Sequence, residues 1–126
     1  MNEANVTFDK DCRAAIGVFE GFISPTQFQD IANKLHDERQ KNYSNKQLNN
    51  IHSMKVLSQE IQTWINDIWF PKAKQTGLKF LAFVVPVDVF GKLSMDAANK
   101  QAMDTFNIEI QYFDNEANAK AWLKSK

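Results

Sequence analysis

The chain has 126 residues, and its 15 Lys and Arg side chains balance its 15 Asp and Glu side chains, so the formal net charge is zero. This length predicts a single domain over residues 1–126 with a sizeable core. The balanced charge excludes the electrostatic footprint of proteins that bind nucleic acid or anionic membranes. The single cysteine, Cys12, cannot form an internal disulfide, and residues 1–5 lack the features of a secretion signal. We therefore expect a reduced, cytoplasmic protein that does not insert into membranes.

The chain begins with the pattern of an antiparallel hairpin. Residues 6–8 and 14–19 are rich in apolar side chains, and the polar residues 9–12 between them resemble a turn. A helix over residues 24–41 follows, because Ser24 is a good N-cap and Gln27 is placed to complete a capping box. The apolar face of that helix consists of Phe28, Ile31, Ala32 and Leu35. His36 lies at the edge of this face, so we expect a boundary position for it.

Residues 47–51 are a strand candidate, chiefly because helical patterns precede and follow them. The next helix begins at Ser58, and its apolar residues recur at helical spacing. They are Ile61, Trp64, Ile65, Ile68 and Trp69. Pro71 either ends that helix or begins a short second one, and Gly77 is a good C-terminal stop.

Residues 79–85 form the most informative segment, because the run is apolar at every position after Lys79 and is followed by Pro86. A strand of this kind must be covered on both faces, as a parallel strand between two helix layers is. A loop, a helix over residues 94–106 and a strand over residues 108–113 come next.

A last helix, capped by Asp114 or Asn115, completes the order β-β-α-β-α-β-α-β-α. The predicted class is therefore α/β, with a five-stranded, mostly parallel sheet, an N-terminal antiparallel hairpin and helices packed on both faces.

This order, together with the patterns at residues 69–90 and 110–123, resembles the SpoIIAA-like or STAS superfamily, and in particular its small stand-alone bacterial proteins of unassigned function. In the anti-sigma-factor antagonists of that superfamily, a serine that opens the helix after the third strand is phosphorylated. The resemblance places Ser58 at that position, but the family's preceding aspartate and following glycine are absent here. Ser58 is therefore a candidate phosphosite or a plain N-cap, and Glu60 would repel a phosphate there.

Catalytic and metal-binding patterns are not evident in the sequence. Cys12, His36 and His52 are too scattered for a zinc site, and the four glycines form no phosphate-binding loop. We therefore expect no metal and no cofactor. A weak enzyme that uses His52 with Ser53 is the least favoured function.

A rim of candidate binding residues follows from the carboxyl ends of the predicted strands, where open α/β sheets bind their ligands. The candidates are Asn49, Asn50, His52, Ser53, Asp88, Phe90 and Phe70. On a regular helix Phe70 would point away from the Ile61 to Trp69 stripe and be exposed. Alternatively, Pro71 redirects the chain and buries it.

The function that we expect is a non-enzymatic binding or regulatory module that acts through protein–protein interaction, with self-association as a homodimer included. This expectation rests on the absence of a catalytic constellation and on what the resemblance implies. We expect the binding surface at Phe70, Phe90 and the Asn49 to Ser53 rim. The alternative is a small apolar-ligand binder of the SEC14-like type, to which the superfamily is structurally close. An enclosed apolar cavity between the helix that begins at Ser58, the helix over residues 94–106 and the sheet would favour that alternative.

Overall fold

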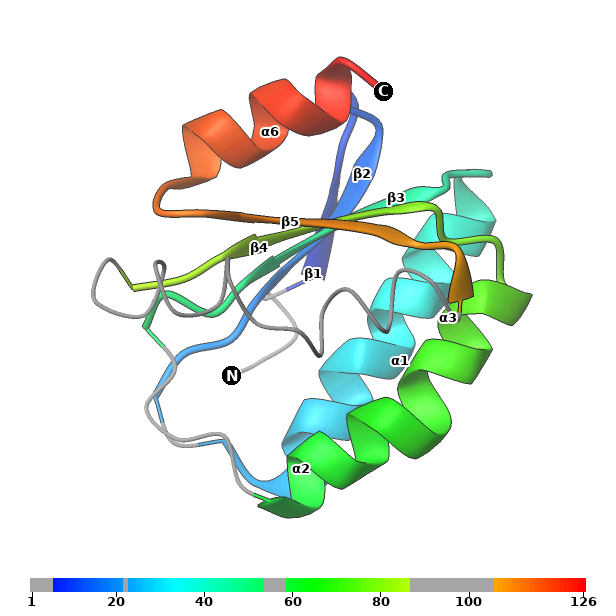
Figure 1. Ribbon diagram of the computed structural model, residues 1–126, viewed down its shortest axis with the longest axis vertical. Helices are drawn as coiled ribbons and strands as arrows, with labels where there is room; N and C mark the ends of the chain where they lie inside the picture. The colour runs from blue at the N-terminus through cyan, green and yellow to red at the C-terminus, as the bar shows by residue number, and fades with distance from the viewer. Residues whose placement is uncertain (1–5, 22, 54–58, 87–105) are drawn as a thin grey trace.

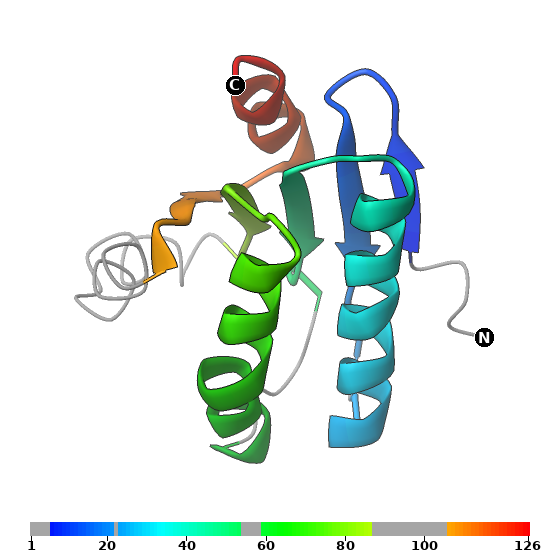
Figure 2. The ribbon, with the colours of Figure 1, turned by 90° about the vertical axis from the view of Figure 1, so that its right-hand side faces the viewer.

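The computed structural model describes residues 6–21, 23–53, 59–86 and 106–126. Its five strands form one sheet in the order β1-β2-β3-β4-β5. Figure 1 shows α6 on one face of this sheet, and α1 with the helical segment from α2 to α3 on the other face. Figure 2 shows that α1 and the α2 to α3 segment run side by side. The architecture is the predicted α/β sandwich of helices around a sheet.

The predicted hairpin is confirmed. β1 (Val6–Asp9) pairs antiparallel with β2 (Ala14–Val18). The Asp9 side chain stabilises the turn, because its Oδ1 accepts hydrogen bonds from the backbone N–H groups of Asp11, at 2.8 Å, and Cys12, at 3.3 Å. The other three strands are β3 (Lys46–Asn50), β4 (Phe80–Val84) and β5 (Glu109–Phe113), and the pairs from β2 to β5 are all parallel.

Helix α1 (Pro25–Lys41) begins as the sequence predicts. The Ser24 hydroxyl oxygen accepts from the Gln27 backbone N–H at 3.1 Å, and the Gln27 side-chain oxygen accepts from the Ser24 backbone N–H at 3.0 Å. This reciprocal pair satisfies two backbone donors that a helix start leaves free. The capping box therefore sets where α1 begins and so how its apolar face meets the sheet.

The second helical segment contains a π-helix that the sequence pattern did not reveal. It consists of α2 (Gln59–Trp64), the π-helix η2 (Ile65–Trp69) and α3 (Phe70–Gln75). Trp64 and Phe70 both have right-handed helical backbone angles, so the chain stays helical from one element to the next. The Phe70 N–H donates to the Ile65 carbonyl five residues earlier, which is the π-helical bond.

The wider turn rotates the residues that follow it relative to a regular helix, and this explains one wrong prediction. Ile68, predicted to face inward, is 51 % exposed. Phe70, offered as an exposed candidate, is only 8 % exposed and stacks on Phe106 with ring centroids 5.7 Å apart. Pro71 lies in the first turn of the short helix α3, which begins at Phe70, so Pro71 does not end the helical segment.

The strand β4 is covered on both faces, as its apolar sequence predicts. Leu81 packs with α3 and β5 residues on the face that bears α1, whereas Ala82 and Val84 pack toward α6. Helix α6 (Glu116–Lys124) is capped by Asn115, whose side chain accepts from the Asn118 N–H at 2.8 Å. The N-cap of this helix is therefore Asn115 and not Asp114, the other predicted candidate.

Three further predictions have different outcomes. Gly77 follows the end of α3 with φ of +89°, a left-handed conformation that favours glycine and ends the helix as expected. The predicted loop after Pro86 and nearly all of the predicted 94–106 helix lie outside the described residues. Among the described residues, no helix is long and apolar enough to span a membrane.

Candidate functional site

An apolar pocket lies at the carboxyl ends of β2, β3 and β4, between the sheet, α1 and η2. Its volume is about 60 Å³ and it is partly enclosed. It is lined by Phe19, Phe28, Ala32, Asn49, Ile51, Ile65, Trp69 and Phe83. The carboxyl edge is where open α/β sheets bind their ligands, so this pocket is the candidate site.

Two residues just beyond the strands are held in the pocket wall by extensions of the sheet. The Phe19 N–H donates to the Asn50 carbonyl at 2.9 Å, and the Ile51 N–H donates to the Val84 carbonyl at 2.9 Å. Phe28 comes from the first turns of α1 and meets Phe19 with ring centroids 4.9 Å apart. The capping box of α1 therefore also determines where one wall of the pocket stands.

The π-helix supplies the opposite wall, through Ile65 and Trp69. Trp69 is 4 % exposed and its ring stacks on His36 with centroids 5.5 Å apart. π-Helical turns are rare and occur frequently at functional sites. Their presence in a pocket wall is consistent with a binding role for this part of the molecule.

One polar side chain, that of Asn49, lies in the otherwise apolar lining. Strand register places Gln47 and Asn49 beside Leu81 and Phe83, on the sheet face that α1 covers. The Gln47 Nε2 group donates to Asn49 Oδ1 at 2.8 Å, and the Gln47 Oε1 atom accepts from Arg39 Nε at 2.8 Å. A chain of hydrogen bonds therefore runs from the interior toward the pocket.

At the other end of this series of hydrogen bonds is a largely buried polar cluster, which we define as His36, Arg39, Gln47 and Thr76. Thr76 is half-buried, and the other three side chains are buried. His36 and Arg39 have no exposed surface, so the predicted boundary position of His36 is wrong. Arg39 Nη2 donates to Thr76 Oγ1 at 3.2 Å and also to His36 Nδ1. His36 Nε2 and Arg39 Nη1 are buried without a hydrogen-bond partner among the residues that the structure describes.

The electrostatics of the cluster follow from its burial. Burial, then the charge of Arg39 and that of Lys72, lowers the pKa of His36 to about 3, so this imidazole is neutral at neutral pH. Burial lowers the pKa of Arg39 to about 10, which leaves its guanidinium charged. Because arginine has no acceptor atom, His36 Nδ1 must be the acceptor and the imidazole proton must sit on Nε2.

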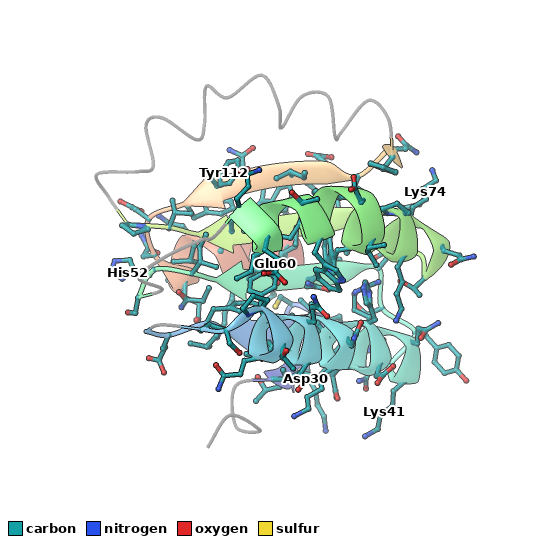
Figure 3. All side chains as sticks on the ribbon, turned by 90° about the horizontal axis from the view of Figure 1, so that it is seen from below. Asp30, Lys41, His52, Glu60, Lys74 and Tyr112 are labelled. Atoms are coloured by element: carbon teal, nitrogen blue, oxygen red, sulfur yellow. The ribbon has the colours of Figure 1, made fainter. Side chains whose placement is uncertain are left out.

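The predicted rim residues do not form one group. Asn49 lines the pocket, whereas Asn50 lies on the opposite face of the sheet, where its Nδ2 donates to Glu116 Oε2 at 2.9 Å. His52 and Ser53 are exposed in a turn, and Figure 3 shows His52 at the end of the molecule opposite Lys41 and Lys74.

The other predicted site residues are accounted for as follows. Phe70 belongs to the core, and its burial removes it from the rim. The positions Asp88, Phe90 and Ser58 lie outside the described residues. Cys12 is buried in the core beneath α6, where burial and then the charge of Asp9 raise the pKa of its thiol.

Sequence reasoning missed most of the pocket lining and the whole buried cluster. The apolar lining residues were assigned to the core, because pattern alone does not distinguish a filled interior from one with a gap. A usable signal did exist in β3, where Gln47 and Asn49 alternate onto the face that a helix must cover. Within the described ranges, no three His, Cys, Asp or Glu side chains gather closely enough to hold a metal ion.

Comparisons with known proteins agree with the α/β class that the sheet and helices define. The SpoIIAA-like family model matches residues 17–124, so the chain belongs to the SpoIIAA-like family. It is similar to a crystal structure of an uncharacterized protein from the DUF3478 family with a SpoIIAA-like fold, from Shewanella loihica PV-4. That match has a TM-score of 0.63 and 16 % sequence identity, and it covers 94 % of this chain and 90 % of the other. No curated protein matches the chain.

Proposed function

We propose that the chain is a non-catalytic binding module that takes a small apolar ligand into the carboxyl-edge pocket. The observation that carries this proposal is the pocket itself, whose lining is aromatic and aliphatic except for Asn49. No nucleophile and no titratable group is among the lining residues, which favours binding over catalysis. This was the alternative in the sequence analysis, and the burial of Phe70 now moves it ahead of the protein-binding mode.

The size of the pocket limits what can enter it. Its volume of about 60 Å³ is below the roughly 300–1,000 Å³ of sites that enclose drug-sized ligands. It is also smaller than an apolar cavity of about 150 Å³ that stays dry and binds benzene. The pocket in this form therefore accommodates a short alkyl group or the end of a longer apolar molecule.

Two measurements test the proposal. Native mass spectrometry of the freshly purified protein should reveal an apolar molecule carried through purification. The substitution Ala32→Val should then abolish that excess mass, because two added methyl groups occupy the pocket. Ala121→Val is the matched control, since Ala121 is exposed on α6 and its substitution has the same effect on helix propensity. Equal ligand loading of wild type and Ala32→Val would refute the pocket as the site.

A second candidate function is protein–protein interaction, including formation of a homodimer. Domains of the SpoIIAA-like class typically act as protein-interaction modules. The specific observation in its favour is Ile68, which is 51 % exposed next to the exposed Pro71 on the outer side of η2 and α3. An exposed large aliphatic side chain of this kind favours a partner surface in place of the predicted Phe70 surface.

The self-association form of this candidate is tested by sedimentation of wild type and Ile68→Asp at equal concentrations. A dimer that dissociates in the variant would support it, whereas the same mass for both proteins would remove Ile68 from the interface. Asn118→Asp, an exposed change on α6 at the opposite face of the sheet, is the control. A cytoplasmic location and the absence of nucleic-acid binding and of cofactors remain predictions from the sequence.

A further inference from the structure

The orientation of the Asn49 amide is determined by a residue that lies outside the pocket. Arg39 has only donor groups, so its Nε–H can pair only with the acceptor atom of Gln47. That pairing directs Gln47 Oε1 toward Arg39 and leaves Gln47 Nε2 to donate to Asn49. The acceptor of that bond must be Asn49 Oδ1. The assignment of both amides therefore follows from the chemistry of arginine alone.

This orientation leaves the two N–H donors of Asn49 Nδ2 for the pocket. Asn49 is 8 % exposed and lines the pocket, and no hydrogen bond from its Nδ2 to any described residue is present. Among the described side chains, the fully buried atoms without a hydrogen-bond partner are His36 Nε2 and Arg39 Nη1, so Asn49 Nδ2 keeps some contact with solvent. An acceptor that enters the pocket would replace this solvent contact with a direct hydrogen bond in a less polar environment, where such a bond is stronger.

We infer that the pocket selects an apolar ligand that carries a hydrogen-bond acceptor oxygen of the carbonyl class, which Asn49 Nδ2 recognises. This inference rests on the proposed function, because it names the ligand class of the same site. Water is a poor substitute for such a ligand, since an ordered water needs two to four polar partners and the lining offers one polar side chain. A hydroxyl oxygen could also accept from Asn49 Nδ2, but its own proton would then face the apolar lining without an acceptor, which favours a carbonyl oxygen.

The test uses butanone and its alkene isostere, in which a CH₂ group replaces the carbonyl oxygen. Both are small enough to probe a pocket of this size, and their dissociation constants can be measured by NMR titration of the isotope-labelled protein. The alkene has the larger hydrophobic driving force, so the informative quantity is the ratio of the two constants in wild type and in Asn49→Leu. Leucine keeps the shape of asparagine but removes both N–H donors.

We expect Asn49→Leu to raise the dissociation constant of butanone about tenfold relative to that of the alkene, which is the effect of losing one well-formed hydrogen bond. We also expect butanone, and not the alkene, to shift the Asn49 side-chain N–H₂ resonances of the wild-type protein. This second measurement needs no variant, so it stands even where loss of the Gln47 partner unfolds Asn49→Leu.

The outcomes separate the two levels of the argument. An alkene that binds wild type, with the ratio unchanged in Asn49→Leu and no selective shift of the Asn49 resonances, overturns the acceptor inference but leaves the apolar pocket in place. Failure of both probes to bind, together with no bound mass in the native spectrum, overturns the proposed function itself.

Discussion

The sheet face that α1 and the α2 to α3 segment cover has two ends, and these differ in how many polar side chains they bury. At the amino end of the parallel strands, the side chain of Arg39 bonds to those of His36, Gln47 and Thr76. The Thr76 side chain is half-buried, and the other three are buried. At the carboxyl end, an apolar pocket remains beside a single amide. Hydrogen bonds thus join the helices and the strand in the interior of the first end, whereas apolar walls enclose a pocket at the second end.

The amino end also explains how a buried guanidinium is tolerated without a bonded carboxylate among the described residues. Arg39 lies in the last turn of α1, and its Nη2 reaches Thr76 at the end of α3. The carbonyl groups at helix C-termini carry partial negative charge, which stabilises a nearby cation. Arg39 therefore joins α1, β3 and the end of α3. We expect this end of the sheet to contribute stability and the other end to bind the ligand.

The largest expected effect is at the amino end. Arg39→Ala should lower the free energy of unfolding by about 3–5 kcal/mol, because it removes packing and leaves Gln47 and His36 without their donor. Urea denaturation measures this loss, and Lys34→Ala, an exposed change on the same helix, should stay within about 0.5 kcal/mol. A loss below about 1 kcal/mol for Arg39→Ala would contradict the structural role of the cluster.

The pH dependence of stability should locate the same cluster. The pKa of His36 is lowered to about 3 in the folded protein, against about 6.5 for an unperturbed histidine. Its neutral form is therefore favoured by folding, and this contribution is complete above pH 6.5 and is lost as the pH falls toward 3. The loss approaches about 1.4 kcal/mol per pH unit.

The measurement is the unfolding free energy of wild type and His36→Phe from pH 7.5 to pH 5, at which other groups titrate equally in both proteins. The wild type should lose about 2 kcal/mol more than the variant between pH 7.5 and pH 5. Identical slopes would mean that His36 is not buried in its neutral form.

Replacing one alanine at each end with valine compares how tightly the two ends are packed. Ala73 is fully buried in α3 and does not line the pocket, so Ala73→Val should cost about 1–3 kcal/mol through overpacking. Ala32 also lies in a helix, but it borders the pocket, which has room for the two added methyl groups. Ala32→Val should therefore change the free energy of unfolding by less than about 1 kcal/mol. Thermal denaturation of both variants measures the difference. Equal losses would show that the pocket offers no free space beside Ala32.

The smallest effect tests the π-helix that forms the pocket wall. Ile68→Ser should change stability by no more than about 0.5 kcal/mol, because Ile68 is half exposed, whereas Ile61→Ser removes a side chain that is 2 % exposed and should cost several times more. Denaturant midpoints of the two variants suffice for this comparison. A large loss for Ile68→Ser would restore the regular helical stripe of the sequence prediction.

Local patterns predicted the elements well where local interactions determine them. The capping box at Ser24, the left-handed stop at Gly77 and the fully apolar β4 all have physical causes within a few residues of chain. The element order along the described chain and the SpoIIAA-like resemblance follow from the same patterns, and the family match agrees with them. These causes are independent of what packs against each element.

The candidate site was predicted less well, because its residues are brought together by tertiary contacts. Helical periodicity cannot reveal the π-helical turn that directs Ile68 outward and Phe70 inward. Composition likewise cannot reveal that Arg39, in a polar stretch of α1, is buried between two helices and a strand.

The sequence by itself determined the α/β class, the helix starts and stops, and the strand that two layers must cover, since these depend on propensity, capping and hydrophobic pattern. Only the tertiary structure decided which polar residues became buried, where the packing left a pocket, and which amide faces it. Those outcomes depend on the fit between side chains distant in sequence, such as Arg39, Gln47 and Asn49, whose hydrogen bonds form only after the helices pack on the sheet.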